Sequence, residues 1–142
     1  MRPETRHPRF PDWPERLAAL WAERAEMPFA WGAQDCVSFA ADAALALTGI
    51  DPLAEYRGRY EDEDSAYKLV GEDGLQAFVS QLMARFGAQE CPVEFAQRGD
   101  WAMVLVGNNL VTGVVVGETV MAPGARRLAQ VPLSRAVIAW AI

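Results

Sequence analysis

One cysteine in this sequence stands where a helix is expected to begin, directly behind an aspartate. Asp35 is of a residue type that caps helix N-termini, and Cys36 would then be the first helical residue. A thiol there lies at the positive end of the helix dipole, which favours the thiolate. The neighbouring carboxylate has the opposite effect. Two interpretations stay open: a cysteine nucleophile, or a small buried residue behind a simple cap.

Further candidate site residues lie next to this pair and in two later apolar runs. Gln34 precedes the cap, and its amide could donate a hydrogen bond to an oxyanion. Trp31 and Gly32 lie in the loop before it, while Trp101 and Thr112 lie in the later runs. We take these four as candidate binding residues, and the two tryptophans together with Trp140 could line a groove for a glycan or a peptide. The structural alternative is that Gln34 bonds local backbone, the tryptophans pack in the core and Thr112 is an ordinary strand residue.

Metal and cofactor chemistry is not expected. Two cysteines, Cys36 and Cys91, and one histidine, His7, are too few for a structural zinc site, and two cysteines are too few to staple a domain of this size. The sequence contains no glycine-rich phosphate loop and no metal-ligand cluster. We therefore expect reduced thiols and no cofactor.

The charge and hydropathy patterns exclude two further classes of function. The net charge of −6, from 13 basic and 19 acidic residues, leaves no surplus for neutralising phosphates, so we expect no nucleic-acid partner. The longest apolar stretches, near 37–50 and 101–116, are interrupted by polar residues and are too short to span a bilayer. The N-terminus has arginines and prolines but no apolar stretch, which predicts synthesis for the cytoplasm without a signal peptide.

The elements that must position these residues fall into two groups. Helical periodicity predicts helices over 13–26, from Cys36 to Leu47, near 64–70 and over 74–86, with Asp12 as a possible cap of the first. Short runs rich in Val, Leu and Thr, separated by turn residues, predict strands at 101–106, 110–116, 118–122, 127–131 and 136–141. Helices followed by close-spaced antiparallel hairpins indicate an α+β fold with a small twisted or partly barrel-like sheet.

The sequence favours a single domain. Its 142 residues suit one core, and residues 12–142 show no linker or repeat. Residues 1–11 contain three prolines and no apolar periodicity, so we expect an extended arm that is frayed. The acidic run 61–64 is expected to be a solvated helix entry. No feature indicates an oligomeric state.

The stretch PFAWGAQDCVSFAADAALALTG resembles the nucleophile region of NlpC-type, papain-like cell-wall peptidases, in which a Tyr-Gly or Trp-Gly loop leads to Asp-Cys at a helix start. It looks closer to an uncharacterised branch of that superfamily encoded among phage and prophage tail genes. The stretches PDWPERLAALWAER, FAQRGDWAMVLV and VPLSRAVIAWAI fit that branch too, so the likeness covers about residues 12–142.

The resemblance implies a cysteine nucleophile at Cys36 and a general base, normally a histidine on a core strand. Matching the glycine of that strand to Gly113 places Val111 where the histidine would stand, and valine accepts no proton. Relatives in the phage branch often have a histidine two residues before the cysteine, where this chain has Gln34. His7, in the arm, is the remaining imidazole.

Three functions are compatible with these observations. The leading interpretation is a tail-associated NlpC-like domain without peptidase activity, which binds a cell-wall or tail component or has a structural role. The alternative is an active cysteine amidase or endopeptidase that cuts host peptidoglycan, with Cys36 as nucleophile and His7 or a carboxylate as base. The third is an intracellular assembly module whose basic arm, residues 2–9, docks onto an acidic partner.

Overall fold

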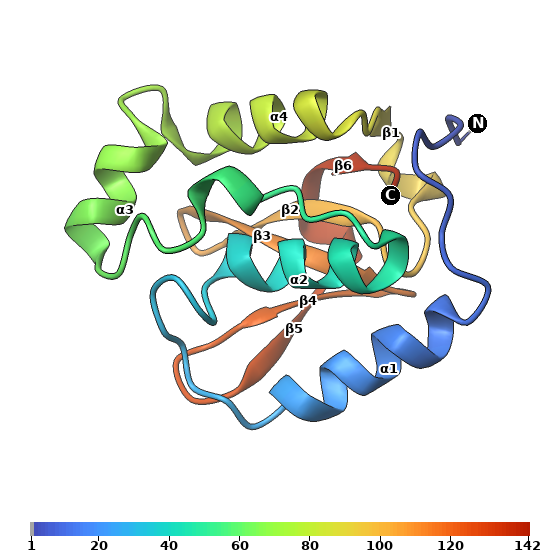
Figure 1. Cartoon of the computed structure of the whole chain (residues 1–142), viewed down its shortest axis with the longest axis horizontal. Helices are drawn as coiled ribbons and strands as arrows, with labels where there is room; N and C mark the ends of the chain where they lie inside the picture. The colour runs from blue at the N-terminus through green and yellow to red at the C-terminus, as the bar shows by residue number, and fades with distance from the viewer. Residues whose placement is uncertain (1) are drawn as a thin grey trace.

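The computed structural model describes residues 2–142, in which four α-helices precede a six-stranded antiparallel sheet (Figure 1). The helices are α1 (Trp13–Arg24), α2 (Cys36–Thr48), α3 (Glu63–Val70) and α4 (Gly74–Phe86). The strands are β1 (Glu90–Cys91), β2 (Trp101–Val106), β3 (Asn109–Val116), β4 (Thr119–Pro123), β5 (Leu128–Pro132) and β6 (Ala136–Trp140). The α+β class is thereby confirmed. Of the helices in the described residues, none is long and apolar enough to cross a bilayer.

The helices lie on one face of the sheet, and α2 is the central one. The strand order is β1-β6-β2-β3-β4-β5, so β2 to β5 form consecutive hairpins while β6 returns to lie between β1 and β2. Helix α2 packs against β3 and β4, and Figure 1 shows it across the middle of the molecule between α4 and α1. The main core fills the space between α2 and the sheet, and its largest buried side chains include Phe39, Leu47 and Trp101.

Helix α2 begins and ends at residues suited to those positions. Asp35 has extended backbone angles and accepts a hydrogen bond from the Ser38 amide, while the Asp35 amide donates to the Ser38 hydroxyl. This reciprocal capping box satisfies two amides at the helix start. Gly49, at a φ of 79°, ends the helix in the left-handed conformation. Four of its alanines, Ala40, Ala41, Ala43 and Ala44, are 0% exposed, and their small side chains let α2 pack closely within the core.

Strand alternation sorts the sheet residues onto two faces. Trp101 and Met103 of β2 and Val114 of β3 join the core beneath α2. Ala102 and Val115 belong instead to a second apolar cluster, which also contains Val104, Val120 and Ala139. Since successive side chains point to opposite faces of a strand, these two clusters lie on opposite faces of the sheet. The same rule decides which β3 side chains can approach α2.

The expectation of a frayed arm is wrong for residues 2–11, although these residues form no regular element. Arg2 and Arg9 both form ion pairs with Asp100, whose side chain is 0% exposed. The Phe10 amide donates to the Leu47 carbonyl at 2.8 Å, which ties the arm to the end of α2. A buried carboxylate requires charged partners, and the arm supplies them. The basic arm is thus engaged within its own chain.

The start of α1 differs from its expected form in one respect. Asp12 makes no capping hydrogen bond through its side chain; its carboxylate instead accepts from the Arg16 guanidinium at 2.8 Å, one turn further on. The proline at the first turn removes one amide that would otherwise need a cap. Helix α1 therefore begins where expected without the predicted cap.

Removal of the Asp100 carboxylate is expected to destabilise the whole domain. Asp100 accepts from Arg2 and Arg9 and from the main-chain amides of Gln97 and Ile142. Asp100→Ala leaves these donors without their shared acceptor, so we expect the free energy of unfolding in urea to fall by about 3 kcal/mol or more. Asp12→Ala, which removes an exposed ion pair, is the matched control and should change stability little. Equal effects of the two substitutions would contradict the role given to Asp100.

Candidate functional site

The Asp35 carboxylate joins the three segments that build the site. It accepts from the Ser38 amide at 2.9 Å, from the Gly32 amide at 2.8 Å and from the Tyr60 hydroxyl at 2.7 Å. Gly32 has a φ of 82°, and a Cβ there would lie 2.7 Å from the Tyr60 carbonyl oxygen, so only glycine fits. The loop before α2, the helix start and the segment at Tyr60 are therefore held around one buried carboxylate.

Cys36 is the first residue of α2, as the sequence predicts, and this half-buried residue lines a cavity. Burial of the thiol raises its pKa to about 11, and the negative charge of Asp35 adds to that rise. The main chain and hydroxyl of Thr112 and the main chain of Val37 lower the pKa and offset part of the rise. Burial thus outweighs the helix start, and the group is a neutral thiol at neutral pH.

Thr112, and not Val111, is the β3 residue that faces the sulfur. Val111 packs with the second apolar cluster on the far side of the sheet. Alignment on Gly113 therefore predicts the wrong residue at the base position, because neighbouring strand residues point to opposite faces. The Thr112 side chain is 0% exposed, and its hydroxyl makes no hydrogen bond of ordinary geometry with residues 2–142. A hydroxyl does not serve as a general base of useful pKa, so the position still lacks a proton acceptor.

Gln34 does not face the cavity. Its side-chain oxygen accepts from the Arg24 guanidinium at 2.9 Å, and its amide nitrogen donates to the Arg24 carbonyl at 3.4 Å. Arg24 also binds Asp42 at 2.7 Å, and Asp42 in turn binds Arg57 at 2.6 Å. The oxyanion-donor interpretation of Gln34 is thus wrong for this structure, since both ends of its amide are engaged in a network that ties α1 to α2 and to Arg57.

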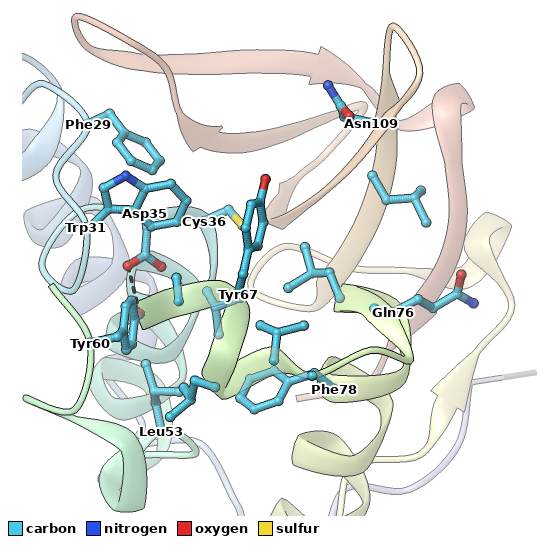
Figure 2. Close-up of a pocket in the computed structure, with 18 of the residues that line it drawn as sticks. Phe29, Trp31, Asp35, Cys36, Leu53, Tyr60, Tyr67, Gln76, Phe78 and Asn109 are labelled. Carbon is cyan, nitrogen blue, oxygen red and sulfur yellow. Dashed lines mark hydrogen bonds between the residues drawn. The ribbon is translucent and has the colours of Figure 1, made fainter. Parts of the chain in front are cut away.

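The cavity beside Cys36 has a volume of about 580 Å³ and is mainly apolar (Figure 2). Its lining comes from the loop before α2, the start of α2, Leu53, the segment from Tyr60 through α3 to α4, and the turn between β2 and β3. Aromatic side chains form much of its wall: Phe29, Trp31, Tyr60, Tyr67 and Phe78. Phe29 and Trp31 pack edge to face, with ring centroids 4.8 Å apart. Such a cavity suits an apolar group of a ligand.

The other sequence candidates fall into two groups. Trp31 is 36% exposed and lines the cavity, so it remains a candidate binding residue, with Gly32 beside it shaping the loop. Trp101 is 0% exposed within the core, which excludes contact with a ligand. His7 donates from Nε2 to the Phe86 carbonyl at 2.8 Å and packs on the Phe86 ring, at the C-terminal end of α4 and outside the residues that line the cavity.

Sequence reasoning missed most of the cavity wall. Tyr60 bonds Asp35 across 25 positions of the chain, and no local pattern indicates such a contact. Tyr67 is 64% exposed in α3 and lines the cavity, as do Asn108 in the β2–β3 turn and Asn109 at the start of β3. The one sequence signal for this wall is Tyr67, an aromatic residue in a short amphipathic helix. It points to a binding site only when α3 is known to lie beside Cys36.

The lining contains no group positioned to take a proton from the thiol. It includes no histidine, lysine or arginine, and Asp35 is its one carboxylate. Both Asp35 oxygens already accept hydrogen bonds. Burial, followed by the bond to Asp35, raises the pKa of Tyr60, so that hydroxyl remains a donor. In the part of the chain that the structure covers, no group of three potential metal ligands occurs. The lining of the cavity therefore offers the thiol no free proton acceptor.

Comparison with known proteins places the chain in a family. A family model described as "Domain of unknown function (DUF6950)" matches residues 8–142. The chain belongs to the DUF6950 family. No curated protein and no solved structure is a significant match to it. In this DUF6950 chain the match includes α1, the cavity and the whole sheet, so the site described above lies within the family domain.

Loss of the Tyr60 hydroxyl is expected to loosen the site of this DUF6950 protein. Tyr60→Phe leaves Asp35 with two of its three donors, so we expect a loss of about 1–2 kcal/mol in the free energy of unfolding, measured by urea denaturation. Tyr67→Phe removes a hydroxyl from the exposed side of the same cavity and serves as the control, with no comparable loss. Equal stability of Tyr60→Phe and wild type would show that the Asp35 bond contributes nothing to the fold.

Proposed function

We propose that this DUF6950 chain is a papain-like domain of the NlpC type that has lost hydrolytic chemistry and binds a partner through the cavity beside Cys36. A helix that begins with Cys36 and packs against an antiparallel sheet supports the likeness to papain-like domains. The Gly-Asp turn before β2 and the loop before Asp35 agree with the sequence resemblance. The proposed attachment to a phage or prophage tail rests on that resemblance.

The observation that carries the proposal is the residue opposite the sulfur. Thr112 occupies the β3 position that faces Cys36, and burial holds the pKa of the thiol near 11. Cysteine hydrolases need a thiolate for attack and an acid for the departing amine. Proton transfer of that kind contributes typically about 10²–10⁴-fold in rate. The absence of a group for this proton transfer, beside a cavity that is still present, favours binding over catalysis.

The proposal predicts that Cys36 performs no hydrolysis. Purified protein incubated with peptidoglycan, with products followed by mass spectrometry, should release no fragments above background at neutral pH. Cys36→Ala is the matched control, and it should give the same product profile as wild type. A thiol-directed activity probe should label Cys36 more slowly in the folded chain than in the urea-unfolded chain, since burial raises the pKa of the thiol only in the folded state.

Two results would contradict this proposal. One is release of peptidoglycan fragments by wild type but not by Cys36→Ala. The other is faster labelling of Cys36 in the folded chain than in the unfolded chain. Either result would favour the alternative of an active cysteine amidase, with a base delivered by a rearrangement or by another molecule.

A further inference from the structure

We propose that the cavity binds a peptide segment that carries an apolar side chain flanked by basic residues. This inference rests on the proposed function, because it names the ligand class for the same cavity. It follows from three features: the apolar interior of the cavity, the amide side chains in its lining and the charge of the segment 60–76, which forms part of its wall.

The interior selects for an apolar group. Leu53, Val70 and Leu75 line it together with the aromatic side chains, and the thiol of Cys36 is neutral there. Transfer of apolar surface out of water favours binding in proportion to the area buried. A charged group placed in the interior would lose its water, and the oxygens of the one lining carboxylate, Asp35, are already occupied by three hydrogen bonds. The group that enters the cavity is therefore uncharged.

Aromatic and amide side chains at the cavity suit a peptide backbone. Trp31 and Tyr67 are partly exposed, and Figure 2 shows Asn109 and Gln76 on other sides of the cavity. Amide side chains both donate and accept, which matches the alternating N–H and C=O groups of an extended peptide. Tryptophan and tyrosine combine a large apolar area with few rotatable bonds, so they bind at a low entropic cost.

The wall at residues 60–76 carries a strong negative charge. This segment contributes nine lining residues, and between and beside them it contains six carboxylates, none of which lines the cavity itself, against one lysine, Lys68. The six are Glu61, Asp62, Glu63, Asp64, Glu72 and Asp73, all exposed. None of them forms an ion pair with another described residue. These unpaired carboxylates complement basic residues on either side of the inserted apolar group and disfavour an acidic ligand.

Synthetic peptides can separate these requirements. The probe is a tetrapeptide of lysine, phenylalanine, leucine and lysine, acetylated and amidated at its ends, with binding to the intact protein measured by calorimetry. Replacing both lysines by glutamate should weaken binding by at least about fivefold, and replacing both by serine should weaken it less. Replacing the phenylalanine and leucine by serine should abolish measurable binding, because nothing then enters the cavity.

Charge-reversal variants locate the basic residues of the ligand. Glu61→Lys combined with Glu72→Lys should lower the affinity for the lysine peptide by about fivefold and raise that for the glutamate peptide. The matched control, Glu94→Lys combined with Glu118→Lys, changes net charge equally at exposed sites outside the cavity and should alter affinity by less than about twofold. Tyr67→Ala, at an exposed position, should weaken every peptide that carries the apolar pair.

The outcomes distinguish this inference from the function on which it rests. Equal binding of the lysine, glutamate and serine peptides would overturn the charge preference while leaving a binding cavity. Binding of the lysine peptide that survives loss of its apolar pair would also overturn the inference, since the acidic wall alone would then account for it. No binding of any peptide by the folded protein would contradict both the inference and the proposed binding role.

Discussion

The site depends on one buried carboxylate at the start of α2. Asp35 accepts hydrogen bonds from its own helix, from the preceding loop and from Tyr60, and without these bonds the three segments would have no common anchor. The same contacts place Cys36 at the first helical position and bring Trp31 and Tyr60 to the cavity. The Asp35 side chain therefore positions the thiol. Its oxygens, however, are already occupied by hydrogen bonds, and its charge disfavours a thiolate. The carboxylate that organises the site thus also opposes ionisation of the neighbouring thiol.

The helix start and burial have opposite effects on the pKa of the Cys36 thiol, and the effect of burial is larger. A helix N-terminus favours a thiolate, and the amide of a residue such as Val37 contributes to that effect. Removal of water from the sulfur has the larger effect on the pKa. A thiolate loses more stabilisation when its water is removed than the nearby amides and one hydroxyl provide. In a cysteine hydrolase an imidazolium would supply the missing stabilisation. Thr112 supplies a neutral hydroxyl instead, so the architecture suited to a nucleophile holds a neutral thiol in an apolar cavity.

Local patterns in the sequence predicted the elements well and the contacts between them poorly. The capping of α2 by Asp35, its end at Gly49 and the antiparallel hairpins all follow from residues close together in the chain. The anchoring of the arm by Asp100 and the bond from Tyr60 to Asp35 join distant residues, and no periodicity reveals them. Strand register is the instructive case: a shift of one position exchanges Val111 for Thr112 and changes which side chain faces the sulfur.

Titration of the Cys36 thiol decides whether this site holds a neutral thiol or an activated nucleophile. Protein labelled with ¹³C at the cysteine β carbons can be titrated by NMR, with Cys91→Ala used to assign the Cys36 resonance. We predict that Cys36 stays a thiol through neutral pH and ionises with a pKa of about 11. Ionisation of Cys36 at or below about pH 7, in the range of activated cysteine nucleophiles, would contradict it.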